Sequence, residues 1–261
     1  MELPVNHFKR AILSGTPAYG VWLVSGAPAN AEALGCSGFD FLVLDTEHTP
    51  IDTTQVAEIL RTIASTPASA VVRPAWNDMV IIKRLLDAGA QSLLIPFVQN
   101  AEEARRAVSY TRYPPDGIRG VAGVHRGSRY GNVPNYAKLV ANELCVILQI
   151  ETLAALDHLP AIAAVPGVDS IFIGPADLSA SMGHLGDMGH QAVQDKLREG
   201  AQRCRELGKP CGIVGPNPEQ VRRYLDYGFS WVAINSDIGM MVSRATEWLG
   251  QVKSPAASQA R

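Results

Sequence analysis

The chain alternates between short apolar runs and longer amphipathic stretches, and this alternation limits its fold more than any other feature. Most of the apolar runs are continuous in Val, Ile, Leu and Phe, as in parallel strands that are covered on both faces. Eight runs have strand character: Tyr19–Val24, Phe39–Leu44, Ala70–Arg73, Ser92–Pro96, Leu144–Ile150, Ser170–Gly174, Cys211–Val214 and Trp231–Asn235. Helical patterns lie between them: Thr53–Ser65, Met79–Ala88, Ala101–Tyr110, Leu153–Ala164, Gln191–Leu207 and Pro218–Tyr227.

Eight β/α units in about 250 residues match the size of a (β/α)8 barrel. The alternative is an open doubly wound sheet, which usually carries a glycine-rich phosphate fingerprint after its first strand. The first run here leads into Ser25-Gly26-Ala27-Pro28, which lacks that fingerprint. We therefore expect an α/β fold, a single (β/α)8 TIM barrel over residues 1–250, followed by a disordered tail at 251–261.

Polar residues gather where the apolar runs end, which in a barrel is the catalytic face. They are Asp45-Thr46-Glu47-His48, Arg73, Gln99, Gln149 with Glu151, Gly174 to Asp177, and Asn235 with Ser236. Glu151 and Asp177 follow successive strands, so their carboxylates should project from the same end of the sheet. Two such oxygen ligands suit a hard divalent cation that keeps positions free for substrate. The alternative is that both are turn residues or helix caps.

The same face offers a base and a cation. His48 exchanges a proton near neutral pH, and Arg73 is suited to stabilise a developing oxyanion. A histidine base, an arginine and a bound metal ion are together the groups needed to form an enolate. The alternatives are a loop histidine that caps a helix and an arginine in a surface salt bridge.

Other kinds of site lack the residues they need. Schiff-base chemistry requires a lysine desolvated inside the barrel, but no lysine lies within an apolar run or at its carboxyl end. The four cysteines form no CxxC pair, and the formal net charge of −2 favours neither nucleic acid nor a membrane surface. We expect a cytoplasmic protein with free thiols and no nucleotide cofactor.

Five segments of the chain closely resemble the class II, metal-dependent pyruvate aldolases. The family includes 4-hydroxy-2-oxoheptanedioate aldolase and 2-dehydro-3-deoxyglucarate aldolase, and the likeness extends from about residue 7 to residue 245. The segments, in family order, are Asp-Thr-Glu-His at 45–48, Val-Arg-Pro-Ala-Trp-Asn-Asp at 72–78, Arg-Tyr-Pro-Pro-Asp-Gly-Ile-Arg-Gly at 112–120, Gln-Ile-Glu-Thr at 149–152 and Gly-Pro-Ala-Asp-Leu-Ser at 174–179.

The resemblance implies reversible retro-aldol cleavage of 4-hydroxy-2-oxo acids to pyruvate and an aldehyde. It implies Glu151 and Asp177 as ligands of Mg, Mn or Co, with Zn as a further possibility. It also implies His48 as base and Arg73 as enolate stabiliser. Substrate would be held by Arg73, by Gln149 and by the backbone amides of Ala176 and Asp177.

The family further implies that Asp45 and Asp87 tune the histidine, and that the protein is a homohexamer, a trimer of dimers that exchange a C-terminal helix. Asp87 lies near the end of the helix after the third strand, roughly 15 Å from the catalytic face at a rise of about 1.5 Å per residue. We therefore expect it to act on His48 of a neighbouring subunit, or else to be an ordinary acidic residue of the last helical turn.

Some features leave the substrate open. The glycine-rich segment 112–136 interrupts the β/α rhythm, and a loop of that length usually covers a site, makes a subunit contact or lies free on the surface. Its Arg119, Arg126 and Arg129 are candidates to meet a second carboxylate of the substrate. Rival functions are a barrel lyase acting on a malyl- or citryl-type CoA thioester, and a non-catalytic barrel that binds oxo acids.

Overall fold

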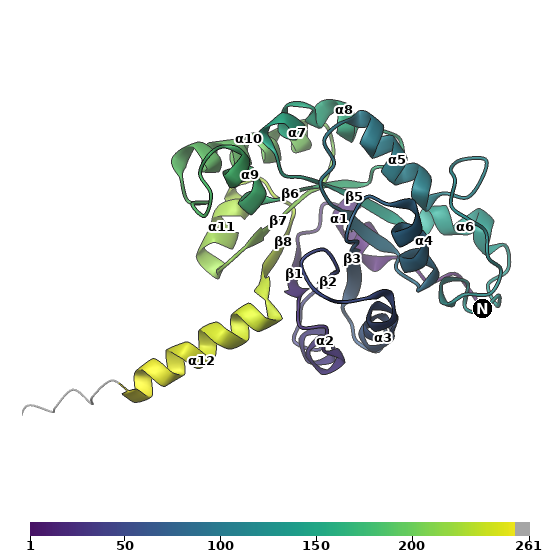
Figure 1. Cartoon of the computed structure of the whole chain (residues 1–261), viewed down its shortest axis with the longest axis horizontal. Coiled ribbons are helices and arrows are strands. Elements are labelled where there is room, and N and C mark those ends of the chain that lie inside the picture. The colour runs from purple at the N-terminus through teal and green to yellow at the C-terminus, as the bar shows by residue number, and fades with distance from the viewer. Residues whose placement is uncertain (254–261) are drawn as a thin grey trace, which may run out of the picture.

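The computed structural model describes residues 1–253, which form a closed barrel of eight parallel strands surrounded by helices (Figure 1). Each strand pairs with its neighbours in sequence order, and β1 closes on β8. The strands are β1 Ala18–Leu23, β2 Phe41–Asp45, β3 Ser69–Arg73, β4 Ser92–Ile95, β5 Cys145–Ile150, β6 Ser170–Ile173, β7 Cys211–Gly215 and β8 Trp231–Ser236. The closed order confirms the single-domain barrel and excludes the open sheet.

The helices follow the strands in the expected alternation, with several more than the sequence patterns predicted. Leu153–Ala164, predicted as one helix, is divided at His158 into α7 and α8, because Pro160 belongs to the first turn of a new helix. The helices are α1 His7–Leu13, α2 Pro28–Gly35, α3 Thr53–Ile63, α4 Met79–Asp87, α5 Ala101–Thr111, η1 Arg126–Ser128, α6 Tyr136–Glu143, α7 Leu153–Asp157, α8 Leu159–Ala163, α9 Pro175–Ser181, α10 Gln191–Glu206, α11 Pro218–Tyr227 and α12 Asp237–Lys253.

Large aromatic side chains fill the barrel interior. Phe41 and Trp231 pack edge to face with ring centroids 5.6 Å apart, and Phe8 of α1 lies against both rings. Trp231 fits because residue 212 is glycine: a Cβ there would lie 2.1 Å from the indole. This packing closes the interior, so that ligands must bind at a rim rather than pass through the barrel.

Strand register brings the polar residues of the sequence motifs to one rim. Asp45 of β2 is the register partner of Arg73 of β3, and both are the last residues of their strands. Ile150 pairs with Ile173, so Glu151 and Gly174 leave the barrel side by side. The rim at the carboxyl ends of the strands therefore collects Asp45, Arg73 and Glu151.

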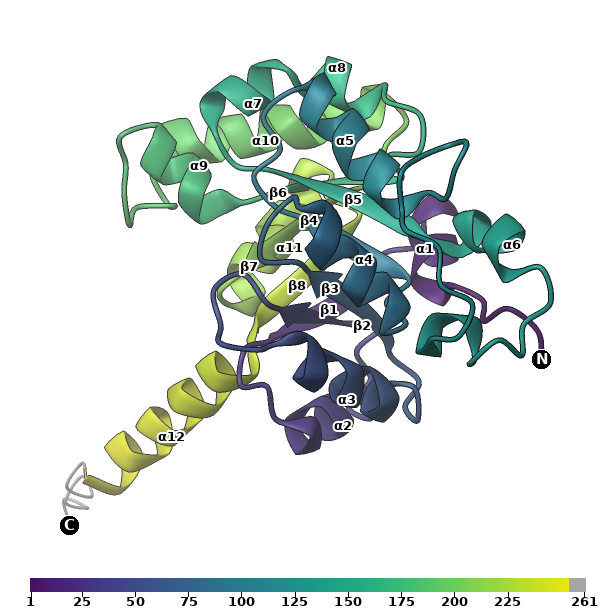
Figure 2. The ribbon, with the colours of Figure 1, turned by 45° about the vertical axis from the view of Figure 1, so that its right-hand side comes forward.

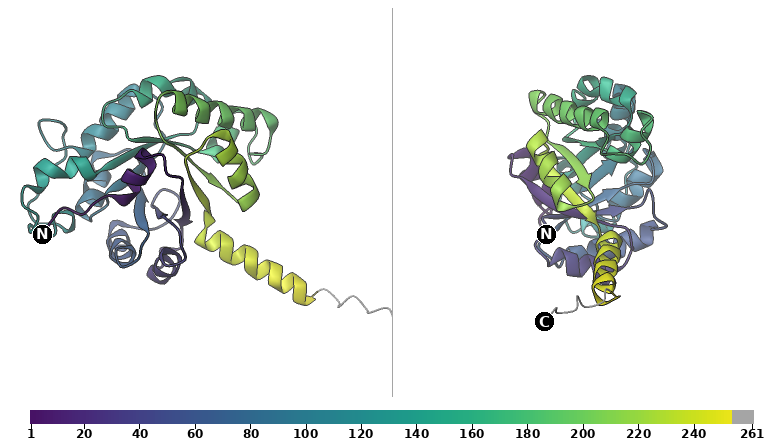
Figure 3. Two further views of the ribbon diagram at one scale, coloured as in Figure 1. Left: turned by 180° about the vertical axis from the view of Figure 1, so that it is seen from behind. Right: turned by 90° about the vertical axis from the view of Figure 1, so that its left-hand side faces the viewer.

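Helix α12 projects away from the barrel instead of covering a strand pair (Figures 1 and 2). The view from behind shows the same projection (Figure 3, left). Asp237 is its only buried residue. The Asp237 carboxylate accepts hydrogen bonds from the Val24 N–H at 3.0 Å, the Ser25 hydroxyl and the Asn30 side chain at 3.2 Å, which fixes the start of the helix to the β1–α2 loop.

Residues 251–253 continue α12, and the remainder of the tail predicted at 251–261 lies outside the described residues. Within residues 1–253, no helix combines the length and the apolar character that crossing a bilayer requires.

Candidate active site

A cavity of about 380 Å³ opens at the carboxyl ends of the strands, which is where we expected the catalytic face. Its walls are apolar towards the barrel and polar towards the rim. It is lined by Trp22, Val24, Asp45, His48, Arg73, Gln149, Glu151, Phe172, Gly174, Pro175, Ala176, Asp177, Met188, Val214, Pro216, Asn235 and Ser236. Every predicted site residue except Asp87 therefore lines one cavity.

Arg73 is held in place by two carboxylates and an indole. Its Nε and Nη2 donate to Asp45 at 2.8 Å each, and its Nη1 lies 2.8 Å from Glu47 Oε2. The guanidinium carbon is 4.3 Å from the centroid of Trp22. The side chain is 10% exposed. Because a guanidinium carries five N–H donors, those that are not hydrogen-bonded to Asp45 are available to a ligand, and the two Asp45 contacts fix the geometry of the group.

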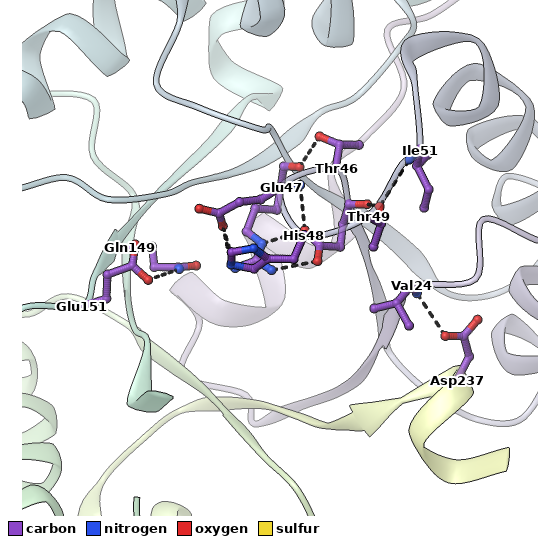
Figure 4. Close-up of polar contacts among 11 residues, drawn as sticks. Val24, Thr46, Glu47, His48, Thr49, Ile51, Gln149, Glu151 and Asp237 are labelled. Atoms are coloured by element: carbon purple, nitrogen blue, oxygen red, sulfur yellow. Dashed lines mark hydrogen bonds and ion pairs between the residues drawn. The ribbon is translucent and has the colours of Figure 1, made fainter. Parts of the chain in front are cut away.

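The loop after β2 folds back on itself to present Glu47 and His48. Asp45 Oδ1 accepts the Glu47 N–H at 3.0 Å, and the Thr49 hydroxyl donates to the Asp45 carbonyl at 2.5 Å. His48 is exposed, and its Nε2 lies 3.8 Å from Glu47 Oε2. Among the described residues, Glu47 is therefore the carboxylate that pairs with His48. Asp45 is instead hydrogen-bonded to Arg73. Figure 4 shows this loop facing Gln149 and Glu151.

Glu47 is the site residue that sequence reasoning did not single out. Its side chain is 14% exposed and links Arg73 to His48. Burial raises the pKa of its carboxyl, against the opposing effect of the Arg73 charge. The only sequence signal was its place inside the Asp-Thr-Glu-His string, which does not reveal which way each side chain points.

Glu151 is a buried carboxylate without a salt bridge in residues 1–253. Its Oε2 accepts from the Gln149 side chain at 2.5 Å, and its Oε1 accepts from the Phe97 N–H at 2.8 Å. Burial is the main cause that raises the pKa of Glu151 to about 7, and the nearby charges of Glu47 and Asp177 add to it. An opposite charge next to a buried carboxylate favours its ionised form, so a bound cation would stabilise Glu151 in this position.

The oxygen atoms of and around Glu151 suit a divalent cation. Gln149 Oε1 is buried without a hydrogen-bond partner, and a Cβ at Gly174 would lie 2.9 Å from Glu151 Oε2, so glycine keeps that side open. Asp177, in the first turn of α9, faces the same cavity. No group of three or more His, Cys, Asp or Glu side chains arranged to hold a metal occurs in the described part of the chain. A cation here would take two carboxylates and complete its shell with substrate and water.

The remaining candidates lie elsewhere. Asp87 accepts from Arg119 Nη2 at 2.7 Å, at the far end of α4, and Arg119 is fully buried. Arg126 donates to the carbonyls of Ala88 and Leu60, at the ends of α4 and α3. Arg119, Arg126 and Arg129 do not line the cavity of their own barrel.

Comparison with known proteins places the chain in a family. Residues 18–243 match the family model described as HpcH/HpaI aldolase/citrate lyase. A pyruvate aldolase of Rhizobium etli is 48% identical over 249 residues, covering 95% of this chain and 98% of that protein. A 4-hydroxy-2-oxo-heptane-1,7-dioate aldolase of Shigella sonnei is 47% identical over 245 residues, covering 94% of this chain and 93% of that protein. The crystal structure of an HpcH/HpaI aldolase/citrate lyase family protein from Burkholderia cenocepacia superposes with a TM-score of 0.93 at 36% identity, covering 96% of this chain and all of that one.

The raised pKa of Glu151 predicts how the stability of the metal-free protein changes with pH. The folded state holds this proton up to its raised pKa of about 7, whereas the unfolded state releases it near the ordinary pKa of 4.5 for a glutamate. The folded state thus binds more protons between these values, so the free energy of unfolding falls as pH rises through that window, by about 3 kcal/mol in all.

Denaturant unfolding in excess chelator at pH 5 and pH 8 measures this effect. The free energy of unfolding of the unmodified protein should fall between pH 5 and pH 8, and Glu151→Gln should remove most of this fall. Glu219→Gln, on an exposed helical turn, should show the same fall as the unmodified protein. Equal decreases in the unmodified and Glu151→Gln proteins would contradict the assignment.

Proposed function

The chain belongs to the HpcH/HpaI aldolase/citrate lyase family and is an aldolase; from this premise we propose that it cleaves 4-hydroxy-2-oxo acids to pyruvate and an aldehyde with a divalent cation. The observation that carries the proposal is the buried Glu151 carboxylate, which has no Lys or Arg partner among the described residues and shares a cavity with Asp177, Arg73 and His48. The relatives at 47–48% identity support pyruvate as the product.

Each group has a role that its contacts support. Glu151 and Asp177 would hold the cation, which supplies Lewis-acid polarisation of a 2-oxo group. Gln149 and the first-turn N–H groups of Ala176 and Asp177 would bind the oxo acid, because these N–H groups have no acceptor within the helix. The N–H groups of Arg73 that are not bonded to Asp45 would face the oxygen on which negative charge develops.

His48 would act as the base. In the cleavage direction it removes the proton of the 4-hydroxyl group, directly or through a water molecule. The electron pair of that O–H bond forms the aldehyde carbonyl, and the bond between carbons 3 and 4 breaks, leaving the enolate of pyruvate. Protonation of carbon 3 then gives pyruvate. The exposure of His48 and its 3.8 Å separation from Glu47 Oε2 support a base that exchanges protons with solvent.

A pyruvate-release assay tests the proposal. Chelated protein should release pyruvate from 4-hydroxy-2-oxoheptanedioate only after Mg, Mn or Co is added, and the best ion identifies the metal. Glu151→Gln and Asp177→Asn remove a charge at constant shape and should each lower kcat by about 100-fold or more. Asp226→Asn, on an exposed face of α11, is the matched control and should retain full activity.

The same assay separates the other functions. Faster turnover of a malyl- or citryl-CoA thioester than of the plain oxo acid would identify a thioester lyase instead. No turnover of either substrate with any of the three ions would favour a barrel that only binds oxo acids.

We further propose that the protein is a homohexamer, a trimer of dimers in which α12 packs on a neighbouring barrel. Five apolar side chains of the projecting helix are more than half exposed: Met241, Val242, Trp248, Leu249 and Val252. Contiguous apolar surface of this kind marks an interaction site. The action of Asp87 on His48 of a neighbour stays a prediction within this arrangement, and so does a cytoplasmic location.

Native mass spectrometry tests the assembly. The unmodified protein should give a mass of six chains. Replacing both Trp248 and Leu249 by Glu should release smaller species, because the charges cannot be buried in an apolar contact. Leu207→Glu, at the exposed end of α10, should leave the hexamer unchanged. A monomeric unmodified protein would contradict the proposal.

A further inference from the structure

The loop after β4 makes an unusual main-chain contact with the metal-site carboxylate. Phe97 has φ 54°, one of five non-glycine residues with positive φ in the described chain. An aromatic residue rarely adopts this left-handed conformation, because its Cβ is crowded there. The strain must therefore be offset by other contacts.

The left-handed turn directs two successive N–H groups at the end of β5. The Phe97 N–H donates to Glu151 Oε1 at 2.8 Å, and the Val98 N–H donates to the Gln149 carbonyl at 3.1 Å. Val98 is fully buried, which fixes one side of the turn. Among the described residues, Phe97 is the only donor to Glu151 that comes from outside β5, so this loop determines where Oε1 lies.

The side chain of Phe97 is anchored by one aromatic partner. Its ring stacks on Trp76 with centroids 5.6 Å apart and an interplanar angle of 29°. Both rings are substantially exposed, Phe97 at 40% and Trp76 at 52%. Burial in the core therefore does not explain the position of Phe97, and the stack is the contact that holds the ring while its backbone stays left-handed.

Trp76 is itself fixed by the β3–α4 loop. Its carbonyl accepts the Asp78 N–H at 2.9 Å, and Asp78 caps α4. The side chain of the intervening Asn77 donates to the Glu103 carbonyl of α5 at 3.2 Å. Glu103 Oε2 in turn accepts the Gln99 N–H at 2.8 Å, two residues after Phe97. The loops after β3 and β4 thus form one connected unit around the stacked rings.

We propose that Trp76 is a positioning residue for Glu151, acting through its stack on Phe97 and the Phe97 N–H. The proposal rests on the proposed function, in which Glu151 is a metal ligand. Trp76 does not line the cavity that holds Glu151. Its loss frees the Phe97 ring, lets residue 97 relax towards negative φ and turns its N–H away from Glu151 Oε1.

Binding of Mn²⁺ to the chelated, substrate-free protein tests this directly, with free Mn²⁺ measured by electron paramagnetic resonance. An aromatic pair of this geometry is worth about three- to tenfold in an equilibrium constant, so Trp76→Ala should weaken Mn²⁺ binding by that factor. Trp76→Phe, which restores a ring, should bind within about twofold of the unmodified protein. Met79→Ala removes a similarly exposed apolar side chain of the same region without touching the stack and should bind normally.

The outcomes separate this inference from the proposed function. Unchanged Mn²⁺ affinity in Trp76→Ala, failure of Trp76→Phe to restore it, or equal weakening in Met79→Ala would overturn the role of Trp76 while leaving the metal site intact. Mn²⁺ binding that is absent from the unmodified protein, or unaffected by Glu151→Gln, would overturn both. A crystal structure of Trp76→Ala should show Phe97 at negative φ, and a retained left-handed Phe97 bonded to Glu151 would also count against the inference.

Discussion

Negative charge in excess of positive charge at one rim is the constraint on which the rest of this structure depends. Asp45, Glu47, Glu151 and Asp177 converge there, and Arg73 is the cation that meets them, through Asp45 and Glu47. The arginine pairs with the carboxylates of the β2 end only. The carboxylates that follow β5 and β6, Glu151 and Asp177, form no ion pair with a Lys, Arg or His side chain among the described residues, although Glu151 accepts hydrogen bonds from Gln149 and from the Phe97 N–H. A divalent cation on that side would balance the charge and would fall in the cavity where an oxo acid binds.

The barrel turns this imbalance into a defined geometry. Parallel closure brings the carboxyl ends of all eight strands to one rim, and register sets Asp45 opposite Arg73 and Glu151 beside Gly174. The aromatic interior supports the rim from below, since Trp22 touches the Arg73 guanidinium and packs at 6.1 Å from Phe172. Rigid supports of this kind matter because electrostatic catalysis needs donors that are already oriented before charge develops. The left-handed backbone of Phe97 adds strain next to the same site, and backbone strain is commonly found at functional sites.

The sequence predicted the scaffold well because buried parallel strands leave a direct trace, a continuous apolar run. All eight strands lie within two residues of their predicted ends. The helical patterns do not predict α2, because Pro28–Gly35 is short and small residues dominate it, or α9, because Pro175–Ser181 spans only seven residues. The positions of Glu151, Asp177 and Arg73 followed from strand ends alone. Glu47 did not, because its direction depends on how the Thr46–Thr49 loop folds back on Asp45. Arg119 pairs with Asp87 through contacts between segments 32 residues apart, which no local pattern encodes.

A crystal structure of the protein with Mn²⁺ and pyruvate shows directly whether Glu151 and Asp177 hold a cation. We expect an anomalous difference peak between these two carboxylates, with pyruvate bound to the same ion and an oxygen of pyruvate facing the Arg73 guanidinium. A peak at another position, or pyruvate bound in this cavity with those two carboxylates turned away from each other, would contradict it.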